Sequence, residues 1–201
     1  MSYNFTKEFI ESGISFREYV QLTDDLLKQN RTTGEGHPDS YIEYTKLNQA
    51  RIRRLEKTIV ISDKLVEKVK SITDKTYLVV ITEAWCGDAA QNIPVFAKLV
   101  EINHNLIIKI FLRDEHEDLI NGYLTNVVSK SIPIIISVNA ETMKENWVWG
   151  PRPLPAQKMH NDHKANPVLD DKEMKRNIQL WYNEDKTLTL QNEILQLFEY
   201  K

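Results

Sequence analysis

The stretch Thr82-Glu83-Ala84-Trp85-Cys86-Gly87-Asp88-Ala89 separates two segments with different apolar patterns. Residues 76–82, which lead into it, are β-branched and aromatic and are apolar on both faces, which predicts a central parallel strand. The segment that follows predicts a helix to about Asn103. The junction holds Cys86, the one cysteine of the chain. A lone thiol between a buried strand and a helix is the most chemically suggestive feature of the sequence, so the other segments are placed around it.

The composition limits the classes of protein that the chain can represent. Its 201 residues suffice for one domain with a sizeable core, and a formal net charge of −3 does not indicate nucleic acid or an anionic membrane as a partner. The first residues lack the basic and apolar segments of a secretory signal, and no window approaches the roughly 18 apolar residues of a membrane span. A single free thiol persists best in a reducing compartment. We therefore expect a cytoplasmic protein of undefined oligomeric state, without a nucleic-acid or membrane partner.

The N-terminal third is predicted to be helical. Ser15 and Glu18 have the spacing of a capping box at the start of a helix that reaches about Asn30. A second helix is expected from near Asp39 to near Lys57, and a third over residues 62–72. Cations crowd the last turns of the second helix, where they either form a solvated helix end or face an anion. These cations are Arg51, Arg53, Arg54 and Lys57.

The middle of the chain alternates between strand and helix patterns. After the helix that follows Cys86, we expect strands over residues 105–112, 132–138 and 142–149, the last of them antiparallel. Short helices are predicted over residues 116–122 and 124–128. Three prolines after Gly150 prevent a continuing strand, and two helices, Asp170–Asn183 and Thr189–Glu199, are expected to complete the chain. The predicted organisation is an N-terminal helical extension (1–74), a core (75–150) and a C-terminal helical segment packed on it (151–201).

Two histidines in the proline-flanked segment have a spacing that suits a metal site on one helix face. His160 and His163 have no further ligand nearby except Asp162, and the segment is polar and loop-like. We therefore interpret them as an exposed pair without a ligand and predict no metal site.

The segment Trp85-Cys86-Gly87-Asp88-Ala89 resembles the Trp-Cys-Gly-Pro-Cys active site of the thioredoxin superfamily. Pro94 is similar in position to the proline that kinks the thioredoxin active-site helix. The pair Ile132-Pro133, 47 residues after the cysteine, resembles the Ile-cis-Pro loop, and Gly150 matches a glycine common after the fourth strand. The resemblance covers about residues 75–150. It implies an α/β thioredoxin-like fold, a four-stranded mixed sheet with flanking helices, here with N-terminal and C-terminal helical extensions. These extensions look like those of a bacterial thioredoxin-like group with Trp-Cys-Gly-Asp motifs.

Three departures from the family pattern restrict the chemistry. Ala89 stands at the position of the resolving cysteine, Asp88 replaces the proline before it, and Val80 replaces a buried aspartate that handles protons. A dithiol reductase needs a second thiol to resolve the mixed disulfide formed by the first. The chain has no second cysteine, so it cannot complete that cycle alone.

The charges around Cys86 have opposing effects on its pKa. The N-terminus of the predicted helix favours the thiolate, whereas repulsion from Asp88, with a contribution from Glu83, raises the pKa. The sequence does not determine the sum of these effects.

Three arginines are candidates for a counter-charge to the thiolate. Arg113 follows the strand predicted beside the Cys86 strand, so it should lie at the same edge of the sheet. There it either offsets Asp88 or pairs with Asp114. Arg51 or Arg54 would take this role if the end of the second helix folds over the Cys86 edge.

The sequence leaves three functions open. The favoured one is a single-cysteine thiol redox protein, in which Cys86 forms mixed disulfides with protein or low-molecular-weight thiols. Glutathione or another external thiol would then resolve them, with no other cofactor. The resemblance implies that the substrate would be bound by Trp85, Gly87, Asp88, Ile132 and Pro133. The alternative is a non-catalytic binding module that uses the cis-proline cleft. The third is metal or cluster binding by Cys86 together with a cysteine of another chain, as in glutaredoxins with a Cys-Gly-Phe-Ser motif, where this chain has Cys-Gly-Asp-Ala.

Overall fold

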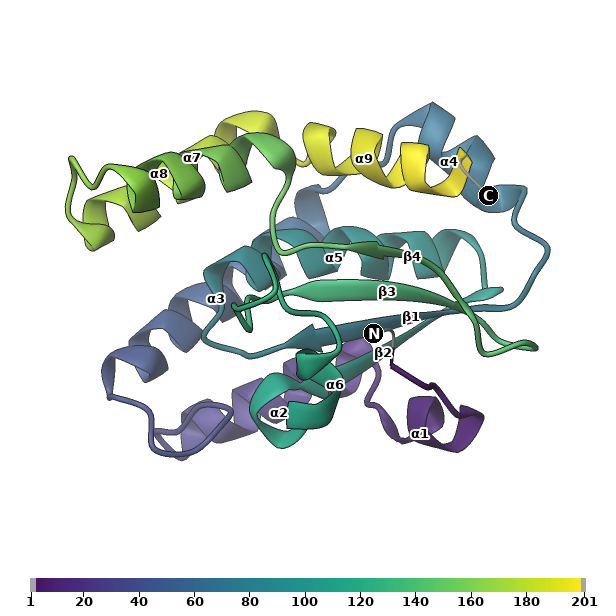
Figure 1. Cartoon of the computed structure of the whole chain (residues 1–201), viewed down its shortest axis with the longest axis horizontal. Coiled ribbons are helices and arrows are strands. Elements are labelled where there is room, and N and C mark those ends of the chain that lie inside the picture. The colour runs from purple at the N-terminus through teal and green to yellow at the C-terminus, as the bar shows by residue number, and fades with distance from the viewer. Residues whose placement is uncertain (1–2, 200–201) are drawn as a thin grey trace.

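A mixed four-stranded sheet organises the structure, a computed structural model that describes residues 3–199 (Figure 1). The strand order is β2-β1-β3-β4, with β2 parallel to β1, β3 antiparallel to β1, and β4 antiparallel to β3. The strands are β1 (Thr76–Thr82), β2 (Leu106–Leu112), β3 (Ile134–Asn139) and β4 (Glu145–Trp149). Every residue of β1 is buried, as expected for a central strand that is apolar on both faces.

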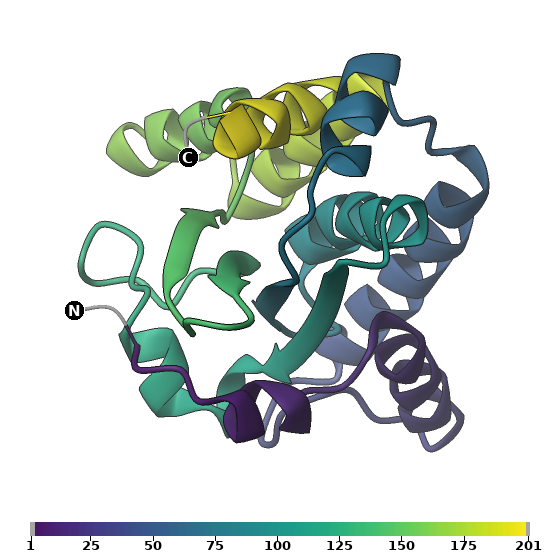
Figure 2. The same ribbon diagram turned by 90° about the vertical axis from the view of Figure 1, so that its right-hand side faces the viewer.

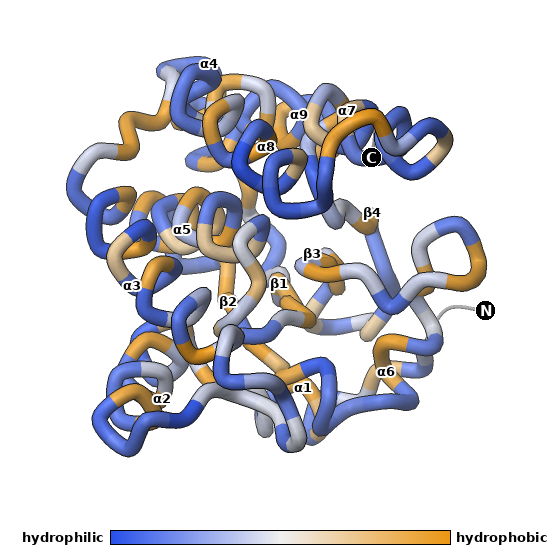
Figure 3. The backbone as a smooth tube through the Cα atoms, turned by 90° about the vertical axis from the view of Figure 1, so that its left-hand side faces the viewer, coloured by the Kyte–Doolittle hydropathy of each residue, from blue (hydrophilic) through white to orange (hydrophobic). Residues whose placement is uncertain are grey.

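Helices cover both faces of the sheet (Figures 1 and 2). The helix that follows Cys86 is α5 (Gly87–Ile102), and it lies on one face beneath α4 (Asp63–Lys70) and α9 (Leu188–Glu199). The opposite face is covered by α1 (Lys7–Ser12) and α6 (Glu117–Asn121). The other helices are α2 (Phe16–Lys28), α3 (Ser40–Thr58), α7 (Leu154–Ala165) and α8 (Asp171–Asp185), with a 3-10 turn at Arg113–Glu115. Along the backbone, the inner strands are apolar and the outer helices carry the polar residues (Figure 3).

The sequence predicted the fold class and most of the elements correctly. The α/β thioredoxin-like arrangement with additional helices at both ends is confirmed. The capping box of α2 is also present: the Ser15 hydroxyl accepts from the Glu18 N–H, and the Glu18 carboxylate accepts from the Ser15 N–H. None of the helices within residues 3–199 has the length and apolar composition that a membrane span requires.

Three local predictions were wrong. Residues 124–128 form a turn closed by a bridge between Thr125 and Ser129, with Asn126 and Val127 in the left-handed region of backbone space. β-branched residues have low helix propensity, and residues with left-handed backbone angles cannot continue a right-handed helix. Helix α1 was not predicted because it is only six residues long. Helix α7 forms where the prolines and polar residues predict a loop, because a helix tolerates proline in its first turn, where the N–H groups have no helical acceptor.

Two tryptophans of β4 pack against the C-terminal helix α9. The Trp149 ring lies 5.7 Å from that of Phe96 on α5, and its indole N–H donates to Glu193 of α9 at 2.7 Å. The Trp147 ring packs edge-on against Phe198, also on α9. The chain therefore returns over α5 after β4, which places α7 and α8 beside the Cys86 loop (Figure 1).

Candidate functional site

Cys86 occupies the N-cap of α5 and is hydrogen-bonded as a neutral thiol. Its Sγ accepts from the Ala89 N–H at 3.4 Å, and its S–H donates to the Ile132 carbonyl at 3.3 Å. The Ile132–Pro133 peptide is cis, as the resemblance implied. Only 7% of Cys86 is exposed. The S–H group of Cys86 therefore already has a hydrogen-bond acceptor, the backbone carbonyl of Ile132.

The surroundings of Cys86 favour its protonated form. Burial, followed by repulsion from Asp88, raises the pKa of the Cys86 thiol to about 12. The Ala89 N–H and the Arg152 charge act in the opposite direction but do not compensate. At neutral pH the thiol is therefore protonated, and the stabilising effect expected from the helix N-terminus is outweighed by burial.

Asp88 belongs to a buried network that joins three segments of the chain. Its carboxylate forms an ion pair with Arg152 at 2.7 Å and accepts from the Tyr182 hydroxyl at 3.1 Å. The Asn92 amide donates both to the Tyr182 oxygen and to the Asp88 carbonyl. Burial, with the Asp88 charge second, raises the pKa of Tyr182. This network ties α5 to the start of α7 and to α8.

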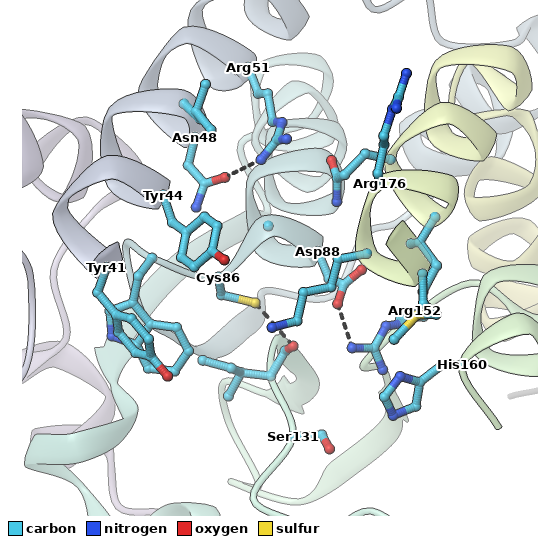
Figure 4. Close-up of a pocket in the computed structure, with 18 of the residues that line it drawn as sticks. Tyr41, Tyr44, Asn48, Arg51, Cys86, Asp88, Ser131, Arg152, His160 and Arg176 are labelled. Carbon is cyan, nitrogen blue, oxygen red and sulfur yellow. Dashed lines mark hydrogen bonds and ion pairs between the residues drawn. The ribbon is translucent and has the colours of Figure 1, made fainter. Parts of the chain in front are cut away.

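The structure assigns other partners to most of the predicted counter-charges. Arg113 pairs with Asp114 at 2.7 Å, not with Asp88, and its guanidinium lies over the Trp85 ring at 4.8 Å. Arg54 donates to Asn183 of α8. Arg51 donates to Asn48 and reaches the Cys86 edge of the sheet, as one alternative proposed (Figure 4).

Arg152 is the cation that pairs with Asp88, and the sequence did not indicate this pairing. The only sequence feature that could have indicated Arg152 as a site residue is its position between Pro151 and Pro153 in a proline-rich run. A pairing across 64 residues depends on the path of the chain after β4, which no local pattern specifies.

A cavity of about 590 Å³ opens beside Cys86. Its walls come from α3, from the Cys86 loop with the start of α5, from residues 129–132, and from α7 and α8 with Arg152 (Figure 4). The structure brings seven of the nine predicted site residues into this wall: Arg51, Trp85, Cys86, Gly87, Asp88, Arg113 and Ile132. The other two, Arg54 and Pro133, do not line the cavity.

Positive charge dominates the wall of this cavity. Seven cations contribute to it, whereas Asp88 is its single carboxylate among residues 3–199. The cations are Arg51, Arg113, Lys130, Arg152, Lys172, Lys175 and Arg176. Because the whole chain has a formal charge of −3, this concentration of positive charge is a local feature.

One end of the cavity is aromatic. The Tyr41 ring lies 4.8 Å from the Trp85 ring and 4.8 Å from the His37 ring. Tyr44, on the next turn of α3, faces Lys175 of α8, whose ammonium lies 5.9 Å from the Tyr44 ring centre. The cavity therefore combines an aromatic wall with charged side chains from the facing helix.

The two histidines do not form an exposed pair, so that interpretation was wrong. His163 contacts Asp171 at 3.1 Å and its side chain is mostly buried. His160 lines the cavity, and its Nδ1 is buried without a partner in the described part of the chain. Burial, followed by the Arg152 charge, lowers the pKa of His160. Within residues 3–199, no three His, Cys, Asp or Glu side chains are arranged to hold a metal.

Two comparisons place the chain among known proteins. Its fold is similar to that of a protein of unknown function, PA1234, from Pseudomonas aeruginosa, with a TM-score of 0.64 and 16% sequence identity over 99% of this chain and 98% of the other. An HIV epitope-scaffold matches with the same values. No curated protein matches the sequence. A family model described as thioredoxin matches residues 34–166, which extends beyond the expected core on both sides. The chain therefore belongs to this thioredoxin family.

Proposed function

We propose that the protein is a non-redox ligand-binding member of the thioredoxin family, with the ligand held in the cavity beside Cys86. The observation that supports this most strongly is the state of the thiol itself. Cys86 is buried, and its S–H donates a hydrogen bond to the Ile132 carbonyl. In this proposal Cys86 is a neutral part of the cavity wall.

Thiol exchange requires a thiolate, and this environment provides very little of it. Because burial and Asp88 raise the pKa of the thiol well above its ordinary value, the thiolate is a very minor form at pH 7. Ala89 also leaves any mixed disulfide without an internal resolving thiol. Both points favour the binding function over the redox function.

The helical extensions complete the proposed binding site. Arg51 and Tyr44 reach the cavity from α3, and Lys175 and Gln179 reach it from α8. Gln179 is itself fixed by the amide of Gln91 on α5 at 2.8 Å. Helices on both sides of the thioredoxin-type loop favour a small molecule over an extended peptide as the ligand.

Exposure to oxidised glutathione and dilute peroxide at pH 7 tests this proposal. We expect the intact mass of the folded protein to remain unchanged, because the thiol is buried and protonated. The same treatment in denaturant should modify Cys86, which controls for the reagents. The Cys86→Ala variant should remain unmodified in both states. A glutathione adduct on the folded wild-type protein would contradict the proposal.

The single-cysteine redox function is the second candidate. The observation in its favour is that Cys86 lines the cavity with its sulfur near the Arg152 charge. If this candidate holds, the folded protein forms a mixed disulfide through Cys86 that an added thiol removes. The same mass measurement therefore separates the two functions.

A further inference from the structure

We propose that the ligand of this cavity is a small organic anion with two or more negative charges at one end and a planar ring at the other, the class that includes nucleoside diphosphates. The inference rests on the proposed binding function and specifies its ligand. In the bound state, the charged end lies between Arg51 of α3 and the cations of α8, and the ring lies against Tyr41 and Tyr44.

Four cations of the cavity wall have no carboxylate partner within residues 3–199. Three of the seven are neutralised: Arg113 by Asp114, Arg152 by Asp88 and Lys130 by Glu117. The remaining four are Arg51, Lys172, Lys175 and Arg176. Arg51 lies on α3 and the other three lie on α8. In Figure 4, Arg51 and Arg176 are on opposite walls, Cys86 and Asp88 lie lower in the view, and the Arg176 guanidinium points away from Asp88. Lys172, Lys175 and Arg176 are exposed and solvated, so they add long-range attraction for an anion with several charges, whereas Arg51 is half-buried.

Arg51 is the strongest single indication of a bound anion. It is half-buried, its one described hydrogen bond is donated to the neutral amide oxygen of Asn48, and its Nη1 lies close to Gly87 at the start of α5. Burial, followed by repulsion from Arg54, lowers the pKa of the Arg51 guanidinium. A partly buried guanidinium is stabilised when an oxyanion accepts from it, and phosphate suits its planar donor geometry. An anion beside Gly87 would also benefit from the helix dipole of α5.

The opposite end of the cavity suits an uncharged ring. Tyr41 presents aromatic surface there beside Trp85, over whose ring the Arg113 guanidinium lies, and Tyr44 continues this surface along α3 toward Arg51. Aromatic rings attract one another through offset or edge contacts. A volume of about 590 Å³ is within the usual range of about 300–1,000 Å³ for sites that take molecules of this size.

Calorimetric titration of the full chain tests this inference with three probes. ADP carries both the ring and the charges, pyrophosphate carries only the charges, and adenosine carries only the ring. We expect ADP to bind most tightly, pyrophosphate more weakly and adenosine most weakly. Raising the salt concentration should weaken ADP binding because the interaction is between charges.

Pairs of matched arginine and lysine variants test whether ADP binds in this cavity. Arg51→Gln should weaken ADP binding about tenfold, because it removes a charge-assisted hydrogen bond in the cavity. The control is Arg53→Gln, two residues away on α3, where the arginine pairs with Asp24 outside the cavity. It should change ADP affinity by less than about twofold. Lys175→Gln combined with Arg176→Gln should weaken binding as Arg51→Gln does.

Several outcomes would overturn the inference. Binding of adenosine as tight as that of ADP would contradict an anionic ligand while leaving a binding cavity in place. Equal losses with Arg51→Gln and Arg53→Gln would place the anion elsewhere. Absence of binding by ADP and pyrophosphate at about 1 mM would exclude this ligand class. None of these results depends on the reactivity of Cys86, so a failure here is distinct from a failure of the proposed non-redox function.

Discussion

Replacing Gly150 with alanine is expected to destabilise the protein by about 3 kcal/mol or more. Gly150 has a φ of +132°, which side chains rarely allow, and an added Cβ would lie 2.3 Å from the Pro133 carbonyl oxygen. Because both atoms belong to the backbone or are fixed to it, the loop that carries Ile132 must move. Denaturant unfolding measures the loss, and faster alkylation of Cys86 would report that its hydrogen bond to Ile132 is broken.

Gly36→Ala provides the matched control for this effect. Gly36 also has a positive φ, of +70°, but a Cβ there would meet nothing within 4 Å. Its replacement should therefore lower the free energy of unfolding by only about 1 kcal/mol, which is the penalty for placing alanine at a positive φ. Similar losses for the two variants would show that Gly150 is required only for its backbone angle and does not set the position of the Pro133 loop.

Asp88→Asn is expected to lower the free energy of unfolding by about 3 kcal/mol and to lower the pKa of Cys86. The ion pair with Arg152 is mostly buried, with 12% and 14% of the two side chains exposed. Removing one charge leaves the other in a poorly solvated site. The pKa falls because repulsion from Asp88 contributes to raising it. Urea unfolding and pH-dependent alkylation measure the two effects.

An exposed ion pair serves as the reference for this loss. Asp162 pairs with Lys158 on α7 with both side chains largely in solvent, so Asp162→Asn should cost less than about 0.5 kcal/mol. Adding Arg152→Met to Asp88→Asn should recover part of the stability, because no unpaired charge then remains. If Asp88→Asn costs no more than Asp162→Asn, the network does not hold α7 and α8 against α5.

The elements that the sequence predicted well have strong local signals. The β-branched run of β1, the capping box of α2 and the spacing of Pro94 and Pro133 from Cys86 are local patterns with a direct structural meaning. Helix α7 was missed because its prolines occupy its first turn, where they do not interrupt hydrogen bonds. Prolines interrupt the hydrogen bonds of a strand but not those of the first turn of a helix, so the same residues are compatible with α7.

The sequence indicates the side of the site that the thioredoxin-type motifs supply, together with Arg113 and, as one alternative, Arg51. Trp85, Cys86 and Ile132 follow from those motifs and line the cavity. Arg152 and the cations of α8 come from distant segments, and their positions depend on how the C-terminal helices pack over α5. The burial of Cys86 also depends on tertiary packing, so the sequence indicates the effect of Asp88 on its pKa but not the larger effect of burial.

The rate of Cys86 alkylation as a function of pH tests the central claim most directly. For a neutral, buried thiol we expect slow alkylation that rises steadily through pH 10 without a plateau, since the pKa is about 12. The unfolded protein should titrate near the free-thiol value of about 8.5 and provides the reference. An inflection in the folded protein at or below about 8.5 would contradict the claim and identify Cys86 as a reactive thiol.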